Sequence, residues 1–127
     1  MKTVLYFTTN VATGVFGTAQ IFDNDGNPLQ ASADGGAPSS TITITVSRHR
    51  VTRVVLSGDE TLRSGWIKLT MSAEAHLVTS AIFQTFNGAS LASEASVLEA
   101  ASVKRGLIYV KTSAGSSNIG VAFVNSE

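Results

Sequence analysis

The chain has no cysteine among its 127 residues. This absence excludes disulfide bridges, thiolate zinc sites and cysteine nucleophiles. Charged residues are also scarce, at 14% against roughly 25% in an average soluble domain. Nine basic and nine acidic residues cancel to a formal net charge of zero, so no global field favours nucleic acid or acidic lipid as a partner. A surface with so little charge does little to oppose self-association.

Long apolar runs are missing as well. No stretch approaches the roughly 18 apolar residues of a membrane span. The N-terminal segment 1–9 has one lysine followed by four apolar residues, whereas a signal-peptide core needs about 7 to 15. The segment is therefore predicted to be a strand. If the natural protein is exported, the chain is a mature form or an excised domain with an added methionine.

Alternation of polar and apolar residues is the clearest positive signal. In segment 41–46, Ile42, Ile44 and Val46 fall on one face of a strand, and Thr41, Thr43 and Thr45 on the other. Similar patterns predict strands at 3–9, 15–22, 51–56, 65–72, 77–86, 107–112 and 119–124. Short strands at this spacing predict an all-β fold, a two-sheet antiparallel β-sandwich of the Ig-like kind with seven or eight strands in a single domain over 1–127.

Three segments lie between the predicted strands. Residues 23–28 predict a tight turn because Gly and Asn tolerate positive φ, and residues 32–40 predict an exposed loop. Residues 93–101 contain good helix formers behind Ser93 and could form a short helix. In an all-β context we expect this segment to be irregular or strand-like.

Five short motifs, in this order, support a resemblance: Phe22 to Leu29, Ser64-Gly65-Trp66, Ala81 to Gln84, Leu91 to Ala95 and Asn118 to Asn125. Together they make the chain similar to a β-sandwich domain of unknown function, often found in tandem in large secreted or surface proteins of soil bacteria. The resemblance spans about residues 5–125. It implies a non-enzymatic module located extracellularly or at the cell surface, with no cofactor and no catalytic residues. The chain departs from the family by standing alone and by carrying Ser47-Arg48-His49-Arg50 where a Pro/Gly turn is usual.

The predicted turn also raises the question of calcium. Asp23, Asn24 and Asp25 place three oxygen-bearing side chains close together. An EF-hand loop needs glycine at its sixth position and glutamate at its twelfth, whereas this chain has Gly26 fourth and Asp34 twelfth. A turn explains the same residues, so we expect no metal site there.

Arg48, His49 and Arg50, with Arg53 nearby, form a local basic cluster. Alternation along a strand would place Arg48 and Arg50 on one side and His49 on the other. Two guanidinium groups could bind a sulfate, a phosphate or an acidic sugar. Charge that protects a sheet edge from strand addition is the alternative that we favour. Nucleic acid would need a broader basic face with aromatic platforms.

Trp66, Tyr6 and Tyr109 could stack on a sugar ring. Each lies inside a predicted strand, where an aromatic side chain more often belongs to the core, and we expect Trp66 to be buried. Catalytic motifs are lacking. Glu94 could act in a hydrolase with another carboxylate, such as Asp59, Glu60 or Glu99, but we expect its role to be the acceptance of backbone N–H groups.

These patterns favour a structural or interaction module that spaces, displays or self-assembles through sheet edges and loops. The row of Thr41, Thr43 and Thr45 is the candidate contact surface, and other domains or identical copies are the expected partners. The alternative is a carbohydrate-binding module for a polysaccharide that uses Trp66, Tyr6 or Tyr109 with Arg48 or Arg50. Nucleic acid is not expected as a partner.

Overall fold

The computed structural model describes residues 1–58, 63–72 and 77–100. Within these ranges it contains strands and no helix. The described residues therefore include no helix that could span a membrane. The strands are β1 (Lys2–Thr9), β2 (Val15–Asp23), β3 (Ser32–Ala33), β4 (Thr41–Val46), β5 (Val51–Ser57), β6 (Gly65–Met71), β7 (Leu77–Asn87) and β8 (Ser90–Leu98). The predicted strands 107–112 and 119–124, and with them Tyr109, lie outside the described residues.

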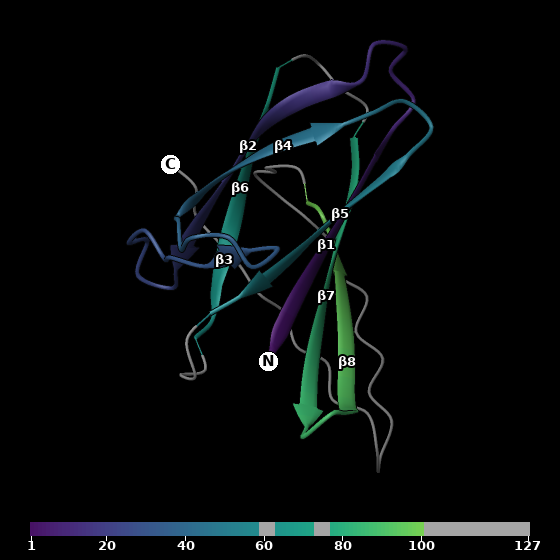
Figure 1. The fold of residues 1–127 in the computed structure, drawn as a ribbon. Coiled ribbons are helices and arrows are strands. Elements are labelled where there is room, and N and C mark those ends of the chain that lie inside the picture. Colours follow the sequence, from purple (N-terminus) through teal and green to yellow (C-terminus); the bar gives the residue numbers. More distant parts are fainter. Residues whose placement is uncertain (59–62, 73–76, 101–127) are drawn as a thin grey trace, which may run out of the picture.

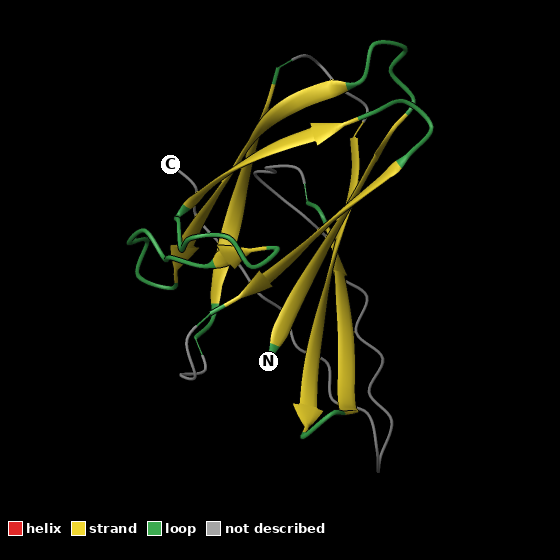
Figure 2. Cartoon of the chain, viewed as in Figure 1, coloured by secondary structure: helices red, strands yellow, loops and turns green. Residues whose placement is uncertain are grey.

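The strands form two antiparallel sheets that lie against each other in an open sandwich (Figures 1 and 2). The larger sheet has the order β3-β5-β1-β7-β8, and the smaller has the order β4-β2-β6. The predicted all-β sandwich is therefore confirmed. β4 and β5 are consecutive but belong to different sheets, so the turn between them crosses from one layer to the other.

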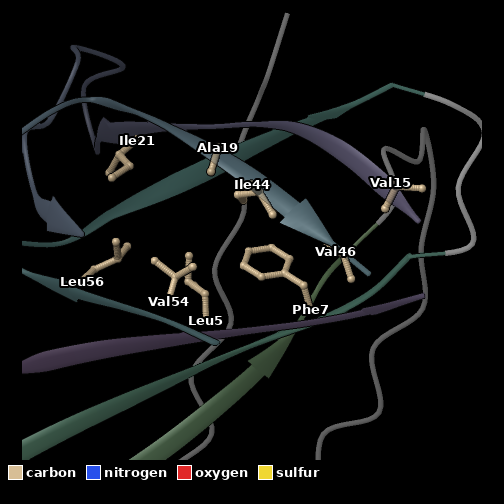
Figure 3. Close-up of a cluster of buried hydrophobic side chains, with 9 residues drawn as sticks. All are labelled: Leu5, Phe7, Val15, Ala19, Ile21, Ile44, Val46, Val54 and Leu56. Atoms are coloured by element: carbon tan, nitrogen blue, oxygen red, sulfur yellow. The ribbon is translucent and has the colours of Figure 1, made fainter. Parts of the chain in front are cut away.

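The core lies where the inner faces of the two sheets meet (Figure 3). It is one cluster of buried apolar residues that come from both layers: Leu5, Phe7, Val15, Ala19, Ile21, Ile44, Val46, Val54 and Leu56. Within each of β1, β2, β4 and β5 the members are an even number of residues apart, as the period of a half-buried strand requires. Burial of these side chains stabilises the fold by about 25 cal/mol for each Å² of apolar surface removed from water.

One segment differs from its expectation, and a second agrees with the strand-like alternative. The predicted loop 32–40 contains β3, which pairs Ser32 with Ser57 and Ala33 with Leu56. Residues 93–98 belong to β8, which pairs with β7 over nearly its whole length. The weak helix propensity of this segment is outweighed by the backbone hydrogen bonds and cross-strand contacts of an antiparallel pair.

Candidate functional site

β4 is an edge strand of the smaller sheet among the described residues, since its only neighbour there is β2. The N–H of Ile21 donates to the carbonyl of Ser40 at 2.8 Å, and the same register pairs Ala19 with Ile42 and Gly17 with Ile44. In an antiparallel ladder only every second residue bonds to a given neighbour. The backbone groups of Thr41, Thr43 and Thr45 therefore point away from β2, toward the open edge.

Side-chain hydroxyls already occupy part of this edge. The Ser39 hydroxyl accepts from the Thr41 N–H at 3.1 Å and donates to the Thr41 carbonyl at 2.8 Å. The Thr52 hydroxyl donates to the Thr45 carbonyl at 3.0 Å. Both backbone groups of Thr43 have no hydrogen-bond partner within the described part of the chain. The open part of the β4 edge is therefore centred on Thr43.

The threonine side chains of β4 lie on the outer, solvent-facing side of the smaller sheet. Thr41, Thr43 and Thr45 are all exposed, whereas Ile44 and Val46 are buried on the inner face. This arrangement agrees with the predicted alternation. Cross-strand neighbours in β2 extend the face, since Thr43 pairs with Thr18 and Thr45 pairs with Phe16.

The basic residues lie in a turn and not along a strand, so the prediction that strand alternation separates them is wrong. The N–H of Arg50 bonds to the carbonyl of Ser47 at 3.3 Å, and His49 has a φ of 57°. The chain reverses here because it leaves one sheet for the other. β4 itself carries no charged residue, so Arg48 and Arg50 could protect this edge only at its end.

A cleft of about 360 Å³ opens at this end of the smaller sheet. It is bordered by the turn between β1 and β2, by the last residues of β4 and by Ser72 after β6. The residues that line it include Phe16, Arg48 and Thr45, whose side chains carry an aromatic ring, a guanidinium and a hydroxyl. A small ligand could therefore meet an aromatic face, a positive charge and hydroxyl groups at one place.

The sheet register accounts for this cluster. Phe16 pairs with Thr45 across β2 and β4, and its backbone bonds to Ser72 on the other side. The Ser72 N–H donates to the Phe16 carbonyl at 2.8 Å, and the Phe16 N–H donates to the Ser72 hydroxyl at 3.3 Å. Directly opposite residues place their Cβ atoms about 5 Å apart. The side chains of Thr45, Phe16 and Ser72 thus form one row across three chain segments.

Phe16 is the residue that sequence reasoning missed. The alternation along β2 places Phe16 on the outer face, because Val15, Ala19 and Ile21 form the inner face. A phenylalanine on the outer face, 65% exposed, was the signal for a contact surface. Its proximity to Arg48 depends on the β4–β5 turn, and no local pattern reveals that.

A second hollow, of about 330 Å³, lies on the other side of the same turn. Its lining includes His49, Thr8, Thr9, Asn10 and Val78. Arg48 and His49 are consecutive but border different hollows.

Two of the aromatic residues predicted as a sugar platform, Tyr6 and Trp66, lie in different sheets. Tyr6 lies on the outer face of the larger sheet, between Arg53 and Ser80. Trp66 lies on the outer face of the smaller sheet, since its neighbours Ile67 and Leu69 pack against the core. The prediction that Trp66 is buried in the core is wrong. It is half-buried and stacks on Phe22, with ring centroids 4.5 Å apart.

In the acidic turn 23–28, the Asp23 carboxylate accepts hydrogen bonds from other residues of the same turn. One oxygen of Asp23 accepts from the N–H groups of Asp25 and Asn27 at 2.9 and 2.8 Å, and the other accepts from the Asn27 side chain at 3.2 Å. Gly26 has a φ of 84°, which suits glycine. The predicted turn is confirmed, and no cluster of potential metal ligands occurs among the residues described.

Glu94 lies on β8 and is exposed. Its carboxylate accepts from the Gln84 side chain at 2.7 Å across the β7–β8 pair. The expectation that it accepts backbone N–H groups is therefore wrong. Asp59 and Glu60 lie outside the described residues.

Comparison with known proteins gives no match: no family model, curated protein or solved structure resembles the chain closely enough to be recognised.

Proposed function

We propose that the chain is a non-enzymatic, extracellular structural or interaction module that joins an identical copy or a neighbouring domain through the edge of its smaller sheet. The observation that carries this proposal is the open part of β4. This strand has no charged residue and no proline, the two kinds of residue that usually block strand addition.

A second copy of β4 fits this edge by symmetry. With a two-fold axis at Thr43, an antiparallel pair would place Thr43 opposite Thr43 and Thr41 opposite Thr45. These are the residues whose backbone groups point outward, so each pair could exchange two hydrogen bonds. Such a contact uses the same surface on both copies, as most protein dimers do.

Two further features support the pairing of like copies. The net charge of zero means that copies do not repel each other at long range. The bonds from Ser39 and Thr52 are exposed, so water or a new strand can replace them at small net cost, since a typical hydrogen bond contributes only about 0.5–1.5 kcal/mol.

Sedimentation velocity over a wide concentration range tests the proposal with the variant Thr43→Pro. Proline removes the outward N–H and leaves every bond to β2 in place. We expect the dissociation constant of the dimer to rise at least about tenfold, because two backbone hydrogen bonds at the axis are lost.

Thr43→Val is the matched control. It keeps both backbone groups and has high strand propensity, so its association should equal that of the unaltered chain. A chain that stays monomeric at every concentration, or a dimer that Thr43→Pro does not weaken, would remove β4 as the contact.

Carbohydrate binding is the second candidate. What favours it is the place of Trp66, whose indole lies on the solvent side of the smaller sheet and stacks on Phe22. Trp66 is the single tryptophan of the chain, so its fluorescence reports directly on a polysaccharide titration. A Trp66→Ala variant that stays folded and loses binding would support this role. An unchanged fluorescence on saturation with polysaccharide would count against it.

A further inference from the structure

The geometry of the cleft beside the β4–β5 turn points to a binding site for a carboxylated sugar, in which Phe16 takes the apolar face of the ring and Arg48 takes the carboxylate. We propose this site in addition to the assembly surface, with which it shares Thr45 alone. It uses neither the open backbone of Thr43 nor the indole of Trp66.

Phe16 supplies the apolar contact. Its side chain is 65% exposed on the outer face of the smaller sheet. That face also carries Thr18, Gln20, Phe22, Trp66, Lys68 and the β4 threonines. A large exposed aromatic at the border of a cleft is more informative than an exposed aliphatic residue, because aromatic side chains dominate the energetics of interfaces. A flat ring of this kind suits the C–H face of a pyranose, which is apolar and of similar breadth.

Arg48 supplies the charge. Its guanidinium makes no ion pair and no hydrogen bond with any residue that the structure describes, and it borders the same cleft as Phe16. A guanidinium stays protonated at any ordinary pH and presents its N–H groups as a fork that matches a carboxylate. An unpaired fork of this kind complements a negatively charged ligand.

Hydroxyl groups complete the polar side of the cleft. The Ser72 oxygen accepts from the Phe16 N–H, which leaves its own O–H free to donate. Thr45 stands on the other side of Phe16 and offers a hydroxyl that has no hydrogen bond within the described residues. Sugar hydroxyls both donate and accept, so this pair can orient a ring that lies on Phe16.

The combination selects among ligand classes. A simple anion would need Arg48 alone, and an apolar ligand would need Phe16 alone. A nucleic acid would need a broader basic surface than one arginine on a neutral chain. The volume of about 360 Å³ lies near the lower end of the range for small-molecule sites, about 300–1,000 Å³. A single acidic sugar unit at a chain end or within a polysaccharide meets all three conditions.

The test is a titration of the ¹⁵N-labelled chain with trigalacturonate, followed by NMR. Backbone signals of residues around the cleft, such as Gly14, Phe16 and Ser47, should shift. Arg48→Ala and Phe16→Ala should each weaken binding at least about tenfold, as the loss of a charge-assisted pair or an aromatic contact does. Phe16→Tyr keeps the ring and should retain binding.

Two controls match these variants. Arg53→Ala removes an arginine from the opposite sheet, where it pairs with Tyr6, and should leave binding unchanged. Thr43→Pro should also leave it unchanged, so failure of the sugar site and failure of the assembly contact are separate results.

Three results would overturn the inference. Equal binding of the methyl-esterified trisaccharide would show that the carboxylate plays no part. Binding that is insensitive to Phe16→Ala and is displaced by inorganic sulfate would indicate an anion site only. The absence of shifts at the cleft under saturating trigalacturonate would show that no such site exists.

Discussion

Thr79 is a single side chain that lowers the stability of the fold. It belongs to β7, pairs with Phe7 and is only 7% exposed. Its hydroxyl oxygen has no hydrogen-bond partner among the described residues. A buried polar atom without a partner costs about 1–3 kcal/mol, whereas an apolar group of the same shape does not carry that cost.

Replacement of Thr79 by valine should therefore stabilise the protein. Valine has the same shape and branches at Cβ, so it keeps the packing and the strand propensity. We expect the free energy of unfolding to rise by about 1 kcal/mol, as measured by urea denaturation. Thr79→Ser, which keeps the hydroxyl and loses a methyl group, should destabilise the chain. A destabilised Thr79→Val variant would mean that the hydroxyl has a partner.

Asp23, in contrast, is a polar side chain whose hydrogen bonds stabilise the fold. The hydrogen bond from the Asn27 N–H, followed by those from the Asn27 side chain and the Asp25 N–H, holds the pKa of the Asp23 carboxyl below its ordinary value. These bonds favour the charged form in the folded state. The carboxylate thus stabilises the turn at neutral pH, and this contribution is lost as the pH falls through the lowered pKa.

The test compares the melting temperature of the unaltered chain with that of the variant Asp23→Asn over a range of pH. At neutral pH the unaltered chain should melt at a higher temperature than the variant. The difference should shrink in acid, below the lowered pKa of Asp23, where both side chains are neutral. A difference that stays constant down to strongly acidic pH would show that charge at Asp23 is irrelevant.

At the scale of elements, β2 is the strand on which the smaller sheet depends. It lies between β4 and β6, and Gly17 allows β6 to approach it closely. A Cβ at position 17 would collide with the Thr70 carbonyl and lie 2.7 Å from the Met71 sulfur. The glycine is needed here for space and not for an unusual backbone conformation.

Gly17→Ala should consequently destabilise the fold by about 1–3 kcal/mol, the usual cost of overpacking. Chemical denaturation measures this change. Gly58→Ala is the matched control, because a Cβ at position 58 meets no described residue within 4 Å. Equal stability of the two variants would contradict the close approach of β2 and β6.

The sequence predicted the long strands and left the short or irregular ones open. β1, β2, β4, β5, β6 and β7 were found from alternation or β-branched content. β3 could not be found, since two small residues carry no period. β8 was ambiguous because Glu94, Ala95 and Leu98 suit a helix, and only pairing with β7 decides their state.

The candidate site was predictable only in part. The outward position of the β4 threonines followed from their period. The outward position of Trp66 could have been predicted in the same way, since Ile67, Leu69 and Met71 alternate with it. The cleft depends on a tertiary arrangement. Phe16 and Arg48 border one cleft because the chain crosses between sheets after β4, and that crossing has no signature in the residues of either strand.

At the scale of the whole molecule, the two proposed contacts differ in how strongly they depend on charge. Strand pairing at β4 involves backbone dipoles and uncharged side chains, whereas sugar binding at Arg48 pairs opposite charges near the surface. Raising the salt from about 0.05 to about 0.5 M shortens the distance over which charges interact several-fold.

Self-association should therefore survive high salt, and the affinity for trigalacturonate should fall. Sedimentation velocity and NMR titration at both salt concentrations measure the two effects. Dimers that dissociate in high salt would point to contacts through charged residues. A salt-independent affinity for the sugar would argue against Arg48 as its main contact.

The central place of β1 in the larger sheet has a consequence for synthesis. Phe7 lies opposite Thr52 on one side and Thr79 on the other, so β1 pairs with strands that are made after it. At about 5–20 residues per second, roughly 4–15 s pass before β7 emerges. Until then, Leu5 and Phe7 lack one of the two strands between which they lie in the folded sheet. We expect chaperones that hold extended apolar segments to bind the nascent chain at this stage.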